Sequence, residues 1–82
     1  MSGDSIKAFG LVIKALRHAQ NLSQEALALE ASIDRTFLSQ LETGRKQPSL
    51  LTIFRLAAAL RLEASELIKQ VEIHLSTAQT AK

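Results

Sequence analysis

Residues 35–43 carry side chains that can donate or accept hydrogen bonds at positions that would share one face of a helix. Steps of three and four residues return to the same side of an α-helix, and polar residues recur at such steps in this segment. An α-helix fits the major groove of B-DNA, where arginine pairs with guanine O6 and N7 and threonine bonds a base or meets a thymine methyl group. The side chains that this pattern predicts to read or hold DNA are Arg35, Thr36, Ser39, Gln40 and Thr43.

Two short helices must position this face. The sequence predicts one helix over residues 24–31, with Ser23 as its N-cap, and a second over residues 35–43, with Asp34 as its N-cap. Gly44 follows at a place where the end of a helix favours a positive φ. Two such helices joined by a tight turn form a helix-turn-helix. The residues expected to face inward from this unit are Leu27, Ala28, Ala31, Ile33, Phe37, Leu38 and Leu41.

The remainder of the chain shows the apolar spacing of further helices and no strand pattern. We therefore expect a single domain over residues 1–82, an all-α fold built as an orthogonal bundle of five helices. The expected segments are a first helix capped by Asp4 or Ser5 and ended by Asn21, a fourth over residues 50–60 after Pro48-Ser49, a fifth over about 64–75 after Glu63 or Ser65, and a frayed tail over 76–82.

Apolar residues in these outer helices define the expected core faces. Phe9 and Phe54 belong to this set and Phe37 to the inward face of residues 35–43, so all three phenylalanines are expected to lie in the core rather than to form a platform for stacked bases. The inward residues are expected to be Ile6, Phe9, Ile13 and Leu16 in the first helix, Leu50, Ile53, Phe54, Ala57 and Leu60 in the fourth, and Leu67, Ile68 and Val71 in the fifth.

The segment from Leu22 to Gly44 also carries a family resemblance. It reads Leu22-Ser23-Gln24-Glu25-x-Leu27-Ala28, then Ile33-Asp34-Arg35-Thr36-Phe37-Leu38-Ser39-Gln40-Leu41-Glu42-x-Gly44. This pattern resembles the phage-repressor/Cro family of helix-turn-helix regulators, the xenobiotic-response-element type, over about residues 6–70. Within that family the chain is similar to small stand-alone regulators, including controller proteins of restriction–modification systems. The resemblance implies a lambda-repressor-like fold and binding to double-stranded DNA.

The resemblance also implies roles for individual side chains. Gln24 stands where the family contacts phosphate and braces the recognition helix. Arg35 and Thr36 stand at base-reading positions, although Arg35 taken alone could be only a surface charge near Asp34. Ser39, Gln40 and Thr43 either read bases or hold the DNA backbone. Arg45 and Lys46, in the following loop, stand where the family meets phosphate or reaches a groove; the alternative is a solvated loop.

Arg17 and Glu42 form a second pair that the resemblance brings out, because the family often pairs an arginine late in its first helix with a glutamate at the end of its recognition helix. We expect a structural ion pair that fixes the pose of the recognition helix; the alternative is a solvated Glu42 and an Arg17 on phosphate. Arg61 departs from the family, which commonly has glycine there. Because an arginine at positive φ costs about 1 kcal/mol, the fourth helix is expected to run on or to end differently.

The apolar residues of the fifth helix fall on two faces, and a small monomer cannot bury both. Leu62, Ile73 and Leu75 are therefore expected to form a two-fold interface, with Leu62 also a buried connector and Ile73 pointing to solvent or to a partner. A single helix-turn-helix reads about half a site, so a homodimer on a palindromic operator is expected.

Composition excludes several other classes. The chain has 82 residues, no cysteine, and ten Lys and Arg against eight Asp and Glu. His18 and His74 are isolated, so no metal site is expected, and neither a cofactor nor a small-molecule ligand is predicted. The chain shows no clustered acid–base pair or phosphate-binding loop, so we do not expect an enzyme. It shows no membrane span and no signal peptide, so a cytoplasmic location is expected.

Together these patterns predict a sequence-specific transcriptional regulator that acts as a homodimer and is controlled by its own concentration, and that acts on its own promoter in a restriction–modification system. The alternative is an antitoxin-like or adaptor module that uses the same fold to bind a protein. That alternative would favour apolar or acidic residues on the outward face of residues 35–43, and none stands there.

Overall fold

The structure, a computed structural model, describes residues 2–80, with side chains described for residues 4–77. All regular structure within these residues is α-helical, which confirms the predicted five-helix, all-α fold. The helices are α1 (Ser2–Ala19), α2 (Gln24–Ala31), α3 (Arg35–Glu42), α4 (Leu50–Ala59) and α5 (Ala64–Thr80). None of these helices is long and apolar enough to cross a membrane.

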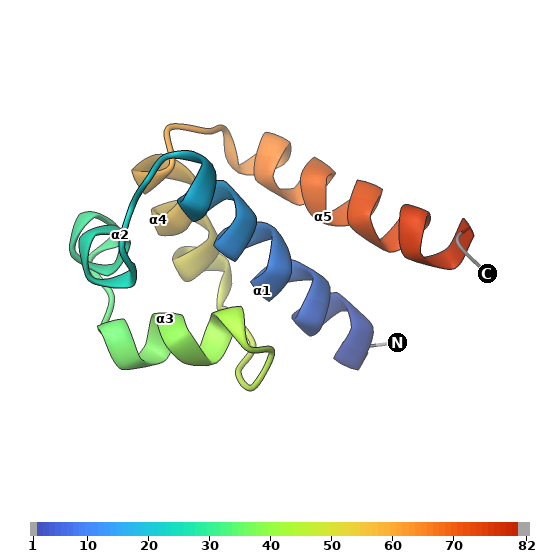
Figure 1. Cartoon of the computed structure of the whole chain (residues 1–82), viewed down its shortest axis with the longest axis horizontal. Helices are drawn as coiled ribbons and strands as arrows, with labels where there is room; N and C mark the ends of the chain where they lie inside the picture. The colour runs from blue at the N-terminus through green and yellow to red at the C-terminus, as the bar shows by residue number, and fades with distance from the viewer. Residues whose placement is uncertain (1, 81–82) are drawn as a thin grey trace.

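Helix α1 lies at the centre of the arrangement (Figure 1). It contacts both α3 and α5, while α2 packs against α3 and α4, and α4 packs against α5. The helix-turn-helix pair α2 and α3 occupies one end of the molecule. The start of α1 and the end of α5 lie together at the other end (Figure 1). The helix expected to read DNA is therefore held by α1 and α2, and α2 in turn packs against α4.

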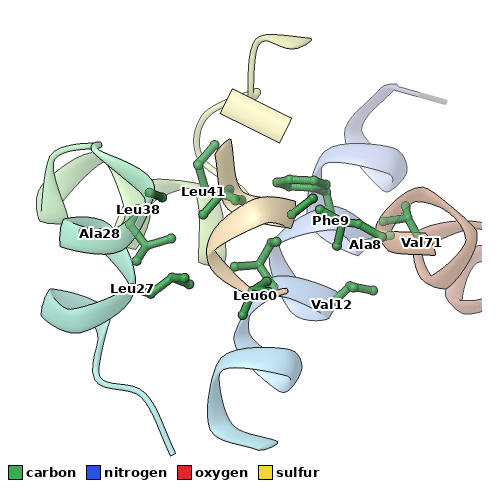
Figure 2. Close-up of a cluster of buried hydrophobic side chains, with 14 residues drawn as sticks. Ala8, Phe9, Val12, Leu27, Ala28, Leu38, Leu41, Leu60 and Val71 are labelled. Carbon is green, nitrogen blue, oxygen red and sulfur yellow. The ribbon is translucent and has the colours of Figure 1, made fainter. Parts of the chain in front are cut away.

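The core is a continuous cluster with contributions from all the helices. Figure 2 shows Leu27 and Leu38 of the helix-turn-helix turned toward Leu60, with Phe9 of α1 on the other side of the cluster. The residues that are less than 2% exposed include large side chains from every helix: Ile13, Leu27, Leu38, Leu41, Leu56, Leu60 and Leu67. The predicted inward faces of α1, α2, α3 and α5 are confirmed in outline, although Ile68 is 38% exposed.

The predicted inward face of α4 is partly wrong. Leu50 is 69% exposed and Phe54 is 54% exposed, whereas Leu56, which the prediction omitted, is fully buried. Phe9 is in the core as expected, and Phe37 is half-buried against it. Helix α4 is apolar around most of its circumference, so the spacing of its apolar residues does not show which face is buried. Contacts with α2 and α5 make that choice.

Within the described residues, four helices are followed, one or two positions after their last residue, by a residue with positive φ. These residues are Asn21 (58°), Ser32 (58°), Gly44 (74°) and Arg61 (62°). Each is followed by a residue whose N–H donates back to a carbonyl five positions earlier, as Leu62 N does to Ala57 O at 2.8 Å. The assignment of Asn21 is confirmed, and the expectation that α4 avoids a left-handed Arg61 is wrong. Two backbone hydrogen bonds and the packing of Leu62 against the core offset the strain at Arg61.

The outer ends of the chain also differ from prediction. Helix α1 begins at Ser2, so Asp4 lies inside its first turn rather than at its cap. Helix α5 follows Glu63, whose N–H donates to Glu66 Oε1 at 2.8 Å. It continues to Thr80, beyond the predicted end near residue 75, so residues 76–80 of the expected tail are helical. Residues 81 and 82 of that tail lie outside the described residues.

Candidate nucleic-acid interface

The helix-turn-helix is built by local signals that the sequence shows clearly. The Ser23 hydroxyl accepts from the N–H of Ala26 at 3.0 Å at the start of α2. The Asp34 carboxylate accepts from the N–H of Thr36 at 3.1 Å at the start of α3. Ser32 takes a left-handed conformation in the turn between them. Both predicted caps are therefore confirmed, and the turn aims the first residues of α3 away from the core.

The outward face of α3 carries the residues predicted to meet DNA. Arg35, Thr36 and Thr43 are exposed, Ser39 and Gln40 are half-buried, and the opposite face is closed by the core. The Thr43 hydroxyl lies 3.0 Å from the carbonyl oxygen of Ser39 and 3.3 Å from that of Gln40. A hydroxyl has a single hydrogen, so Thr43 must break its hydrogen bond to the backbone of α3 before it donates to a phosphate.

Arg45 and Lys46 are exposed in the loop after α3. The loop starts at Gly44, whose φ of 74° turns the chain away from the helix axis. The Arg45 N–H donates to Gln40 O at 2.8 Å, which holds the first loop residue against the end of α3. Two cations thus follow the recognition helix directly, on a backbone that is tied to it.

The predicted ion pair between Arg17 and Glu42 is present. Arg17 Nε donates to Glu42 Oε2 at 2.7 Å, and Nη2 donates to Oε1 at 3.0 Å. Both residues are buried, 7% and 5% exposed. The hydrogen bond to Glu42 raises the pKa of Arg17 above its ordinary value, and the charge of Glu42 acts in the same direction against the cost of burial. The guanidinium also donates to Leu22 O at 2.9 Å, so it ties α1 to the chain that enters α2.

Gln24 extends this ion pair toward the surface. Its Nε2 donates to Glu42 Oε1 at 3.0 Å, and its Oε1 accepts from Arg35 Nη1 at 3.4 Å. The family role expected for Gln24 included bracing of the recognition helix, and these two contacts show such a brace. No sequence pattern foretold that Gln24 would join Glu42 to Arg35, because these contacts run between two separate helices, α2 and α3.

Gly10 is a residue of this site that the sequence analysis missed. A Cβ built on Gly10 would overlap the backbone oxygen of Leu41 and lie 2.8 Å from that of Glu42. Only glycine lets the backbone of α1 approach the last turn of α3 this closely. A glycine within an otherwise helical pattern is a signal of such an approach, and it would have been available from the sequence.

The residues proposed for the two-fold interface do not form one exposed face. Ile73 is 47% exposed, as expected, but Leu62 and Leu75 are half-buried against the core of their own chain. Three apolar side chains that are each more exposed than Ile73 lie elsewhere, on α4. We call this group the α4 patch, and it consists of Leu50, Leu51 and Phe54, which are 69%, 57% and 54% exposed. Within the described residues, no group of three His, Cys, Asp or Glu side chains is placed to hold a metal ion.

Comparisons with known proteins agree with this geometry. A family model described as helix-turn-helix matches residues 13–67. The chain is 37% identical over 65 residues to the control protein C.MunI of Mycoplasma sp, covering 78% of this chain and 88% of that protein. It is 34% identical over 61 residues to the control protein C.BamHI of Bacillus amyloliquefaciens, covering 73% of this chain and 75% of that protein.

A solved structure gives the same result in three dimensions. The restriction-modification controller protein C.AhdI from Aeromonas hydrophila matches with a TM-score of 0.73 and 40% identity, over 76% of this chain and 94% of that one. These relatives are named as regulators rather than as enzymes. By sequence, fold and the geometry of α2 and α3, the chain belongs to the Cro/C1-type helix-turn-helix family of DNA-binding transcriptional regulators.

Proposed function

We propose that this regulator reads a palindromic operator as a homodimer, with α3 of each copy in the major groove. The observation that carries the proposal is the exposure of Arg35 and Thr36 on the first turn of a helix whose other face is locked into the core. The first residues of a recognition helix are the ones that reach base edges. In this account Arg35 pairs with a guanine, and Thr36 contacts the neighbouring base or a thymine methyl group.

The other polar residues of the site hold the DNA backbone or read adjacent bases. Ser39 and Gln40 lie one turn further along α3, where a helix in the groove passes close to a strand. Arg45 and Lys46 follow α3 as exposed cations and neutralise phosphates. Gln24 and Thr43 lie near the two ends of α3 and serve as further anchors. The contacts to the DNA backbone fix the register of the helix on the duplex and carry no sequence information directly.

Self-association follows from the small reading surface of one domain and from apolar surface left uncovered. The α4 patch is a better candidate for the contact than the trio predicted from sequence, Leu62, Ile73 and Leu75. Its members stand at i, i+1 and i+4, on one face of α4, and each is more than half exposed. In the predicted trio, only Ile73 has comparable exposure. The α4 patch also directly follows the loop after α3, so a two-fold axis there would place the two copies of α3 on either side of it.

The relatives suggest the genetic setting. C.MunI and C.BamHI are named control proteins, and C.AhdI is a restriction-modification controller protein. We infer that this chain controls the expression of a restriction–modification system, including its own gene, and responds to its own concentration through dimerisation. The rival reading, a module that binds a protein through the same helix, would need apolar or acidic groups on the outward face of α3, and that face is polar and basic.

Selection of bound sites from random DNA duplexes tests this function. The purified full chain should enrich one sequence arranged as an inverted repeat, with half-site centres about 34 Å apart or a multiple of that distance. Enrichment of single, unrepeated half-sites would contradict the dimer. Failure to enrich any sequence, with binding that depends on salt alone, would contradict base reading.

A further inference from the structure

Four side chains form a continuous chain of hydrogen bonds from the core to the surface that meets DNA. Arg17 donates twice to Glu42, at 2.7 and 3.0 Å. Gln24 donates to the same Glu42 carboxylate at 3.0 Å, and Arg35 donates to Gln24 at 3.4 Å. Side-chain exposure rises along this series of hydrogen bonds, from buried Arg17 and Glu42, through half-buried Gln24, to exposed Arg35. The base-reading side chain is thus linked to the ion pair that joins α1 to α3.

The direction of these hydrogen bonds is decided at Glu42. A carboxylate held by an arginine accepts hydrogen bonds and donates none. The two ends of a glutamine amide have nearly the same shape but opposite hydrogen-bonding character. Glu42 therefore requires the nitrogen of the Gln24 amide on its side. That orientation turns the Gln24 oxygen outward, where it accepts from Arg35 Nη1. The buried Glu42 carboxylate thus causes the Gln24 oxygen, a second acceptor, to lie beside Arg35.

We propose that Gln24 and Glu42 are positioning residues for Arg35, so that the buried carboxylate sets the base selectivity of an exposed guanidinium through the Gln24 amide. The proposal rests on the proposed function, in which Arg35 reads a base. A guanidinium has five N–H donors, and the contact with Gln24 uses one of them. The remaining donors stay available for guanine O6 and N7. An exposed arginine otherwise loses rotamer freedom when it binds, and holding it beforehand reduces that loss.

A double-mutant cycle on base preference tests the proposal. The base pair read by Arg35 is first defined as the one at which Arg35→Ala loses discrimination in the selected operator. The discrimination ratio is the Kd for operators with another base pair at that position divided by the Kd for the selected operator. It is then measured for wild type, Gln24→Ala, Arg35→Ala and the double variant. We expect Gln24→Ala to lower this ratio by about fivefold or more. In the Arg35→Ala background it should leave the ratio unchanged.

A simple phosphate contact by Gln24 gives a different result. Gln24→Ala would then weaken binding equally at every base pair, and by the same factor in both backgrounds, which would overturn the proposal. Lys46→Ala is the matched control for such a contact. It should weaken binding uniformly, reduce the slope of log K against log salt by about 1, and leave the discrimination ratio at wild-type value.

Two further variants separate positioning from folding. Gln24→Lys keeps a donor for Glu42 but offers Arg35 no acceptor, so we expect wild-type thermal stability with a discrimination ratio as low as that of Gln24→Ala. Glu42→Gln removes the requirement for one amide orientation and should lower the ratio in protein that remains helical by circular dichroism. A wild-type ratio in Gln24→Lys would overturn the proposal even if Glu42→Gln fails to fold. If Arg35→Ala leaves the base preference unchanged, the proposed function itself is wrong. If Arg35→Ala lowers the discrimination ratio but the Gln24 variants do not, the proposed function stands and the positioning role is wrong.

Discussion

Arg17 and Glu42, 25 residues apart in the chain, form a bidentate ion pair that joins the end of α1 to the end of α3. Both side chains are buried, so each would leave an uncompensated charge if the other were removed. Such a pair adds little net stability compared with apolar residues, but it specifies one geometry. In this fold the geometry it specifies is the pose of the recognition helix.

Breaking this pair on one side should destabilise the fold strongly. Glu42→Leu leaves the Arg17 guanidinium buried without its partner, so we expect a loss of about 3–5 kcal/mol in the free energy of unfolding. Urea denaturation followed by circular dichroism measures it. The double variant Arg17→Met/Glu42→Leu is the matched control, because it removes both charges and should recover most of the loss. Equal instability of the single and double variants would show that packing, rather than an unpaired charge, is responsible.

Gly10 should not tolerate even a methyl group. Gly10→Ala gains roughly 1 kcal/mol of helix propensity, yet the added Cβ overlaps the backbone of Leu41. We expect the overlap to dominate and the free energy of unfolding to fall by about 1–3 kcal/mol. Thermal unfolding measures the change, with exposed Lys14→Ala on the same helix as a control that should stay within about 0.5 kcal/mol of wild type. A stabilised Gly10→Ala variant would mean that α1 and α3 do not approach this closely.

Arg61 is a position where glycine should improve the protein. At a φ of 62° an arginine carries about 1–2 kcal/mol of strain, while glycine loses about 0.4–1 kcal/mol more conformational entropy on folding. Arg61→Gly should therefore raise the free energy of unfolding by about 0.5 kcal/mol. The same substitution at Arg55, inside α4, should lower it by about 1 kcal/mol. A loss at both positions would contradict the left-handed end of α4.

The α4 patch should carry the dimer contact. Phe54→Glu places a charge in an apolar interface, and we expect the dimer dissociation constant, measured by sedimentation equilibrium, to rise at least about tenfold. Leu29→Glu is the control, since Leu29 is 81% exposed and belongs to α2 rather than to the patch. If Ile73→Glu dissociates the dimer and Phe54→Glu does not, the interface lies on α5, as the sequence alone suggested.

Local signals explain why so much of the fold could be predicted. Ser23, Asp34 and Gly44 act on backbone groups within a few residues, so each is readable from its own neighbourhood. The inward face of α4 was not readable, because an almost wholly apolar helix has no polar side to mark its outside. Arg61 was misjudged because the backbone hydrogen bonds that offset its strain depend on where Leu62 packs.

The site was predictable to a similar degree and for similar reasons. The polar face of α3 follows from helical spacing, and the pairing of Arg17 with Glu42 came from the family pattern. The contacts of Gln24 with Glu42 and Arg35 depend on how α1, α2 and α3 meet, so no single segment encodes them. The close approach at Gly10 also depends on how α1 packs against α3, although the glycine itself was visible in the sequence.

The base preference of Arg35→Ala is the most direct test of the central claim that α3 reads DNA through its first turn. Binding of wild type, Arg35→Ala and Lys69→Ala should be measured on the selected operator and on operators changed one base pair at a time. Each variant loses a single positive charge, and Lys69 lies exposed on α5. We predict that Arg35→Ala loses discrimination at one base pair per half-site, worth about 1–3 kcal/mol, and that Lys69→Ala retains it. Unchanged base preference in Arg35→Ala would contradict the account.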